Sequence, residues 1–130
     1  MDYDFFQGLK VTFRDLQLIN IYRSPNPAHM KCFRQFVQIL TEHLDDGIDT
    51  IICGDFNFNF LTERSNNPLC MALGIRGFQQ IVKEPTTIAG TCIDHVYIRL
   101  RNLKSRYELY SPYYADHDGI LLMLKKRITM

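Results

Sequence analysis

Asp49–Asn57 has the sequence Asp-Thr-Ile-Ile-Cys-Gly-Asp-Phe-Asn, and it determines how the rest of the chain must be arranged. Its first five residues form a short apolar run rich in isoleucine, which predicts a buried strand. Gly54–Asn57 follows directly and carries polar side chains past the end of that strand. A sheet fixes such residues while leaving them exposed at one edge. The segment therefore predicts a layered fold with a candidate site at this edge.

The flanking sequence predicts strands and helices in mixed order within a single domain, residues 1–130. A helix is predicted from Pro27, capped by Asn26, to the region of residues 45–47, where Gly47 suits a left-handed cap. A shorter helix is predicted over residues 69–73. Strands are predicted over residues 11–13, 16–22, 78–82, 93–100, 107–110 and 120–124. This order indicates an α/β or α+β fold with a mixed sheet.

The composition excludes several classes of protein. Fifteen Lys and Arg against fourteen Asp and Glu give a net charge of +1, unlike a histone-like binder or an acidic tail. The longest apolar run is too short to cross a membrane, and Met1–Asp4 does not resemble a signal peptide, so an intracellular protein is expected. The four cysteines are scattered, which indicates reduced thiols rather than a zinc site or disulfides.

Two further polar clusters adjoin predicted strands: Asp94-His95 opens one, and Asp116-His117 precedes another. Carboxylates such as Asp55 and Asp116 are hard oxygen ligands suited to Mg²⁺. Asp94 can orient the imidazole of either His117 or His95 for general acid–base work. In an extended chain, residues two positions apart point to the same side, so Asp55 and Asn57 can converge on one ligand.

An Asp–His dyad, a metal-binding carboxylate and an amide donor together match metal-assisted hydrolysis of a phosphoester. The structural alternative for each cluster is a turn whose Asx side chain bonds the local backbone. Tyr22 and Arg23 end a strand, either as a surface pair or facing a phosphate. The alternating aromatics of 56–60 fit a core position better than a base-stacking surface. The basic run 99–106 fits a solvated hairpin tip or a contact with a nucleic-acid backbone.

Four segments in order resemble the endonuclease/exonuclease/phosphatase superfamily, which has the DNase I-like fold. They are Leu18–Asn26, Gly54–Asn57, Thr91–Val96 and Asp116-His117. The sequence around these segments is most similar to the endonuclease domains of non-LTR retrotransposons and their reverse-transcriptase-linked relatives. The resemblance covers nearly all of this chain, but only the C-terminal half of the family's domain.

The resemblance implies a four-layer α/β sandwich, here truncated at the N-terminus, with a site at one edge of two packed sheets. It implies that Asp55 positions the attacking water and that Asn57 binds the scissile phosphate. Asp94 would pair with His117, which would contact the phosphate or stabilise the transition state. The implied cofactor is Mg²⁺, with Mn²⁺ as a substitute.

The resemblance further implies that Asp116 holds the metal and that Tyr22 and Asn26 bind substrate. Asn26 is offset differently from Tyr22 than in many members, and Ala115 stands where the family usually has Ser. The family's N-terminal half carries an Asn and a metal-binding Glu, and neither motif is found in this sequence. Half a sandwich would expose an apolar sheet face, a liability for aggregation or partner binding.

Three functional hypotheses follow. The first is a Mg²⁺-dependent DNA endonuclease from a retrotransposon-like element, acting in the nucleus. The second is a catalytically impaired remnant that only binds nucleic acid or protein. The third is a phosphatase of the same superfamily. The expected partners are DNA and either a missing N-terminal segment or a second copy of the chain, with no membrane.

Overall fold

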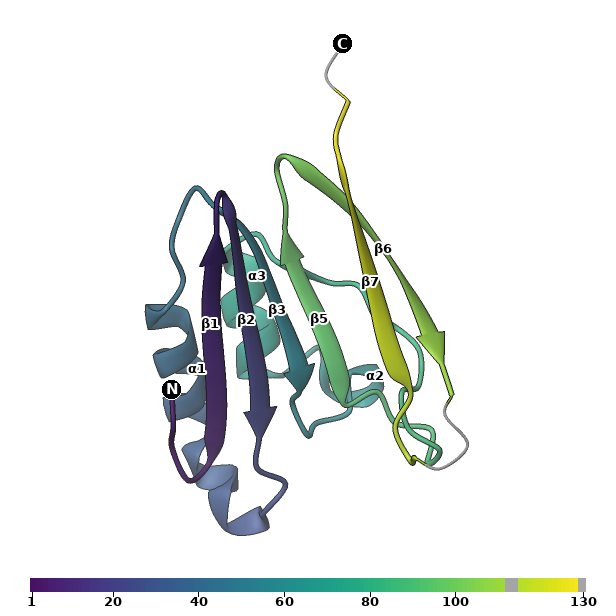
Figure 1. Ribbon diagram of the computed structural model, residues 1–130. Coiled ribbons are helices and arrows are strands. Elements are labelled where there is room, and N and C mark those ends of the chain that lie inside the picture. The colour runs from purple at the N-terminus through teal and green to yellow at the C-terminus, as the bar shows by residue number, and fades with distance from the viewer. Residues whose placement is uncertain (112–114, 129–130) are drawn as a thin grey trace.

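The computed structural model describes residues 1–111 and 115–128, which form two sheets and a layer of helices (Figure 1). The larger sheet has five strands in the order β1-β2-β3-β5-β4, and a hairpin of β6 and β7 forms the smaller one. Strands β2 and β3 are parallel, whereas the other pairs are antiparallel. The predicted α/β fold with a mixed sheet is therefore confirmed.

The element bounds fix the order along the chain. The strands are β1 (Phe6–Phe13), β2 (Leu16–Arg23), β3 (Asp49–Asp55), β4 (Gln79–Gln80), β5 (Asp94–Arg99), β6 (Leu103–Tyr110) and β7 (Gly119–Lys126). The helices are the 3₁₀ helix η1 (Pro27–Cys32), α1 (Phe33–Glu42), α2 (Phe60–Glu63) and α3 (Pro68–Ile75). In the part of the chain that the structure describes, no helix combines the length and apolar character needed to span a bilayer.

One core lies between the large sheet and the helices α1 and α3. Alternation along β2 turns Ile19 and Ile21 to this side, where Phe36 and Leu40 of α1 and Leu73 of α3 join them in the same cluster. All five side chains are at most 1% exposed. Burial of this kind contributes about 1.5–3 kcal/mol per large apolar side chain, so this layer anchors β2 and β3.

A second core lies between the other face of the large sheet and the β6–β7 hairpin. Ile51 of β3 and Val96 of β5 are each 2% exposed, and Tyr107, Ile120 and Leu122 of the hairpin pack against their cluster. The described residues thus form three layers, with helices, the five-stranded sheet and the hairpin in that order (Figure 1).

Several predicted elements differ in extent from those observed. Strand β1 begins at Phe6 rather than at residue 11, because Phe6 is anchored in the first core at 1% exposure. The helix predicted from Pro27 begins as the 3₁₀ helix η1 before α1, although Asn26 caps it as predicted, accepting from the Ala28 N–H at 3.0 Å. Helix α2 was not predicted. The strand predicted over 78–82 is reduced to the two residues of β4.

The hairpin covers only part of the sheet face that it packs against. Leu9, Val11 and Phe13 of β1 and Leu18 of β2 lie toward this face, and they are 67%, 49%, 67% and 39% exposed. In the described sheet β6–β7, strand β7 is paired on one edge only. The predicted exposed apolar face is therefore present over β1 and β2.

Candidate active site

Three neighbouring strands place a row of polar side chains at one end of the large sheet. Tyr22 of β2 is the register partner of Asp55 in β3, and Asp55 is the register partner of Asp94 in β5. Paired residues on adjacent strands project to the same face. All three line a cavity of about 590 Å³ between β2, β3, β5 and β7. The sheet thus assembles this row without help from any loop.

His117 completes the row from the segment that precedes β7. Residues 116–118 pair with the loop at 86–88 through a bridge between His117 and Thr87, and the Asp118 N–H donates to the Thr86 carbonyl at 2.7 Å. This brings His117 Nδ1 to 2.9 Å from Asp94 Oδ2. The structure therefore pairs Asp94 with His117, which the resemblance implied and the spacing left open.

Thr86 is a site residue that sequence analysis missed. It is fully buried, and its hydroxyl donates to the same Asp94 Oδ2 at 2.8 Å. The hydroxyl also accepts the backbone N–H groups of Ile93 and Asp94 at 3.3 and 3.2 Å. Thr86 therefore fixes the Asp94 carboxylate through the same oxygen that His117 contacts. A threonine in an irregular loop gives no periodic signal that could have revealed it.

His95 belongs to the core rather than to the site. It is fully buried, and its ring stacks on Phe56 with centroids 5.0 Å apart and planes 8° apart. Nε2 donates to the Cys92 carbonyl at 2.9 Å, so Nδ1 accepts from the Tyr97 hydroxyl at 3.0 Å. Burial lowers the pKa of His95 to about 4, and the imidazole is neutral at physiological pH.

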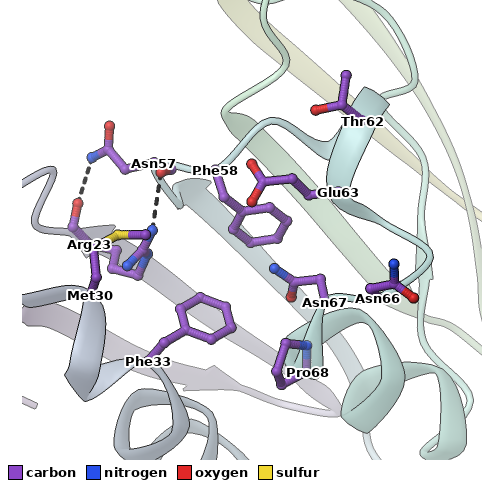
Figure 2. Close-up of a pocket in the computed structure, with 10 residues that line it drawn as sticks. All are labelled: Arg23, Met30, Phe33, Asn57, Phe58, Thr62, Glu63, Asn66, Asn67 and Pro68. Atoms are coloured by element: carbon purple, nitrogen blue, oxygen red, sulfur yellow. Dashed lines mark hydrogen bonds between the residues drawn. The ribbon is translucent and has the colours of Figure 1, made fainter. Parts of the chain in front are cut away.

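Asp55 and Asn57 do not converge as an extended chain would require. Asn57 adopts a positive φ of 52°, and its backbone N–H donates to Asp55 Oδ1 at 3.1 Å, which is an Asx turn. Its side-chain Nδ2 donates to the Arg23 carbonyl at 2.5 Å (Figure 2). The argument from extended geometry is therefore wrong, whereas the phosphate-binding role of Asn57 stays a prediction. One N–H of its amide remains for a ligand.

Arg23 holds this turn in place. It forms neither a surface pair with Tyr22 nor a group that faces a phosphate, which were the two alternatives predicted for it. Only 4% of the residue is exposed, and its Nε donates to the Phe56 carbonyl at 2.6 Å. Its Nη2 donates to the Asn57 carbonyl at 3.0 Å, and the guanidinium lies 4.8 Å from the centroid of the Phe33 ring. Arg23 and Asn57 thus clamp the end of β2 to the turn after β3.

The site favours a divalent cation on electrostatic grounds. Asp55, Asp94 and His117 each offer a ligand atom within 4.8 Å of the others. Burial raises the pKa of Asp55, and the nearby charge of Asp94 raises it further. A cation would offset the repulsion between the two carboxylates, and carboxylate oxygens are the ligands that Mg²⁺ and Mn²⁺ prefer. The donor set present therefore fits such an ion.

The remaining predicted residues lie around this group. Tyr22 is 47% exposed and lines the same cavity as Asp55. Asp116 is exposed next to His117 and is not one of the three clustered ligands, so its role as the metal ligand stays a prediction. Asn26 is exposed, and its side-chain oxygen is engaged in capping η1. Its substrate-binding role likewise stays a prediction.

The pKa values of His117 and His95 are expected to be shifted in opposite directions. The hydrogen bond that His117 donates to Asp94 raises the pKa of His117 above 6.5, with the nearby carboxylates adding to it, whereas the pKa of His95 is about 4. NMR titration of the imidazole protons in EDTA should show His117 charged to a higher pH than a free histidine, and His95 neutral until near pH 4. In Asp94→Asn the His117 midpoint should fall. An unchanged midpoint in that variant would contradict the pairing.

Solved structures share this architecture at low sequence identity. The endonuclease domain of TRAS1, a telomere-specific non-LTR retrotransposon, matches with a TM-score of 0.61 and 14% identity over 90% of this chain and 60% of that one. CdtB, the biologically active subunit of cytolethal distending toxin, matches with a TM-score of 0.57 and 13% identity over 92% and 51%.

A third match is an endonuclease/exonuclease/phosphatase family protein from Leptotrichia buccalis C-1013-b, with a TM-score of 0.55 and 11% identity over 92% and 53%. No protein-family model and no curated protein sequence matches the chain. The chain spans about half to three fifths of the length of these solved structures. The chain therefore has the DNase I-like fold of the endonuclease/exonuclease/phosphatase superfamily, over part of the length of that domain.

Proposed function

We propose that the chain provides the catalytic groups of a Mg²⁺-dependent DNA endonuclease of the kind found in non-LTR retrotransposons. The observation that carries the proposal is the cluster of Asp55, Asp94 and His117, with ligand atoms within 4.8 Å of one another. The fold shared with the TRAS1 endonuclease domain supports it. The proposal implies action in the nucleus.

Each residue of the row has a role that its surroundings suit. Asp55 is the group that positions and deprotonates the attacking water, because its carboxylate lies in the row beside the Asp94–His117 pair. His117, held by Asp94, donates a hydrogen bond or a proton to the phosphate, and Tyr22 contacts the same phosphate from β2. Asn57 offers its free amide N–H to the scissile phosphate.

Asp55 and Asp94 would hold the cation, and the proposal adds Asp116, which is exposed next to His117, as a further carboxylate ligand. When bound, Mg²⁺ supplies charge stabilisation of the phosphoryl oxygens. The chain's own contribution is to fix the donors: Thr86 and His117 both bond Asp94 Oδ2, and the Asn57 N–H bonds Asp55 Oδ1. Such preorganisation is what makes electrostatic catalysis effective.

The substrate class is tested by offering DNA and small phosphomonoesters to the same purified chain. We expect Mg²⁺ to support nicking of supercoiled plasmid, with no nicking in EDTA and no release of inorganic phosphate from inositol phosphates. Phosphate release without nicking would favour the phosphatase alternative. Neither activity, with the fold intact by circular dichroism, would favour the remnant that only binds.

The proposal also includes a polypeptide partner on the uncovered face of β1 and β2. A strand added to the open edge of β7 would lie over the exposed Leu9, Val11 and Leu18, because β7 and β2 line the two walls of one cavity. The occupant proposed is therefore a separate amphipathic β segment, equivalent to the part of the solved domains that this chain does not span.

Lysines on that face are expected to lower dye binding and self-association without unfolding the protein. Leu9→Lys combined with Phe13→Lys should bind less anilinonaphthalene sulfonate than the wild type and should self-associate less in sedimentation, because both positions are 67% exposed. Ile75→Lys, at 83% exposure on the end of α3, is the matched control and should behave as the wild type. Equal dye binding by the double variant and the control would contradict the proposed docking face.

A further inference from the structure

A second pocket lies beside the turn that follows β3 and is separate from the cavity that Asp55 lines. Its volume is about 420 Å³, and it is bounded by the end of β2, by η1 and α1, by the end of α2 and by the start of α3 (Figure 2). Asn57 lines it, so the pocket adjoins the candidate active site through a single turn. Its size is within the range of about 300–1,000 Å³ typical of small-molecule sites.

The floor of the pocket is aromatic. Phe33 and Phe58 meet edge to face, with ring centroids 5.8 Å apart, and Phe58 is 5% exposed (Figure 2). Met30 lies at the side of the floor and is 60% exposed. Flat rings at the bottom of an open pocket favour a planar, apolar-faced ligand.

Two charged groups of opposite sign line this floor together. Arg23 is fixed by the carbonyls of Phe56 and Asn57, and its Nη1 makes no hydrogen bond to any residue that the structure describes. Glu63 lines the pocket from α2 (Figure 2), and among the described residues it accepts one hydrogen bond, at Oε2 from the Asn59 N–H at 3.0 Å. One positive and one negative group leave this floor without net charge, so the pocket suits a ligand without net charge.

Asn67 adds a donor between the charged groups and the floor. The residue is 7% exposed, and its Oδ1 caps α3 by accepting from the Leu69 and Cys70 N–H groups at 2.9 and 3.3 Å. That bonding leaves the amide NH₂ directed toward the pocket (Figure 2). The pocket thus offers donors from Arg23 and Asn67 and an acceptor from Glu63 around an aromatic floor.

We infer that this pocket holds one unpaired nucleobase of a nucleic acid bound at the adjacent Asp55 site. A nucleobase is neutral, planar and carries both donors and acceptors on its edge, which matches the three polar groups. Enzymes that act on nucleic acids commonly hold unstacked bases against aromatic side chains in this way. The nucleic-acid substrate itself rests on the proposed function, whereas recognition of the base rests on the pocket alone.

The test uses free nucleosides in EDTA, so it requires neither a metal nor a phosphodiester. Titration of the ¹⁵N-labelled chain with adenosine, guanosine, cytidine and thymidine should shift the signals of Glu63, Asn66 and Asn67 in a saturable manner for at least one nucleoside. Met30→Trp should fill the pocket and weaken that binding by roughly tenfold or more. Met71→Trp, at a 58% exposed methionine on α3, is the matched control and should bind as the wild type does.

Because the sequence contains no Trp, each variant carries a single indole that reports its own surroundings. The emission of Met30→Trp should lie to the blue of that of Met71→Trp, which verifies that the ring occupies the pocket. Absence of saturable shifts at these residues for all four nucleosides would overturn the inference, as would equal binding by a blue-shifted Met30→Trp. Loss of plasmid nicking with nucleoside binding intact would instead count against the proposed function alone.

Discussion

Asparagine in place of Asp94 is expected to lower the rate of Mg²⁺-dependent plasmid nicking by about 10²–10⁴-fold, the usual contribution of a positioned acid or base. The reason is that Asp94 Oδ2 bonds His117 Nδ1 at 2.9 Å and is the principal cause of its raised pKa. Asn keeps the shape of the side chain but loses the charge that favours the imidazolium. Nicked-circle formation on gels, with circular dichroism to verify folding, measures the effect.

Thr86 provides the matched control for this prediction. Thr86→Ser keeps the hydroxyl that donates to Asp94 Oδ2 at 2.8 Å, so nicking should stay close to the wild-type rate. Thr86→Val removes that hydroxyl and should lower the rate by roughly tenfold, the effect expected for one hydrogen bond of about 1.4 kcal/mol. A rate for Asp94→Asn equal to that of Thr86→Ser would contradict the proposed role of the Asp94–His117 pair.

Gly54→Ala is expected to be among the most destabilising single substitutions in the protein, by roughly 3–5 kcal/mol. Gly54 has a φ of 142°, and a Cβ at this position would overlap the Ile21 carbonyl oxygen. That oxygen belongs to the backbone of β2, the parallel neighbour of β3, so it cannot move without opening the ladder. Thermal unfolding followed by circular dichroism should show a midpoint lower by roughly ten degrees or more.

Gly74→Ala is the matched control for the Gly54 variant. Gly74 lies in α3 with open space where a Cβ would be placed. The substitution should therefore raise stability by about 0.5–1 kcal/mol, because alanine has the better helix propensity. A midpoint for Gly54→Ala as high as that for Gly74→Ala would show that β2 and β3 do not approach as closely as described.

Strand β3, with its continuous β-branched apolar residues, and the alternating strand β2 were predictable from the sequence, whereas only parts of the half-exposed strands β1 and β6 were. The run ending at Cys53 predicts β3 because it is buried on both faces, by the helices and by the hairpin. The first half of β6 alternates uncharged, partly buried residues with exposed charged ones, so its lysine and arginine suggested a hairpin tip. Helix α2 was missed because Phe56, Phe58 and Phe60 alternate as in a strand, whereas their rings gather around His95.

The site could be predicted in part, and the sequence is also enough to exclude one alternative, the pairing of Asp94 with His95. Adjacent residues of a strand point to opposite faces, so His95 cannot share the face of Asp94. That argument alone selects His117, which the resemblance also implied. Thr86 was beyond prediction because it reaches Asp94 from an irregular loop without periodicity, and the buried position of Arg23 was beyond prediction because its partners Phe56 and Asn57 are 33 and 34 residues away. The left-handed turn at Asn57 likewise depends on its bond to β2.

The central claim is that Asp55 lies in a working, metal-dependent phosphodiesterase site. The measurement that tests it most directly is nicking of supercoiled plasmid by the purified wild type and by Asp55→Ala, each with Mg²⁺ and with EDTA. The account predicts nicked circle only from the wild type with Mg²⁺. Equal amounts of nicked circle from the wild type and from Asp55→Ala in Mg²⁺ would contradict it.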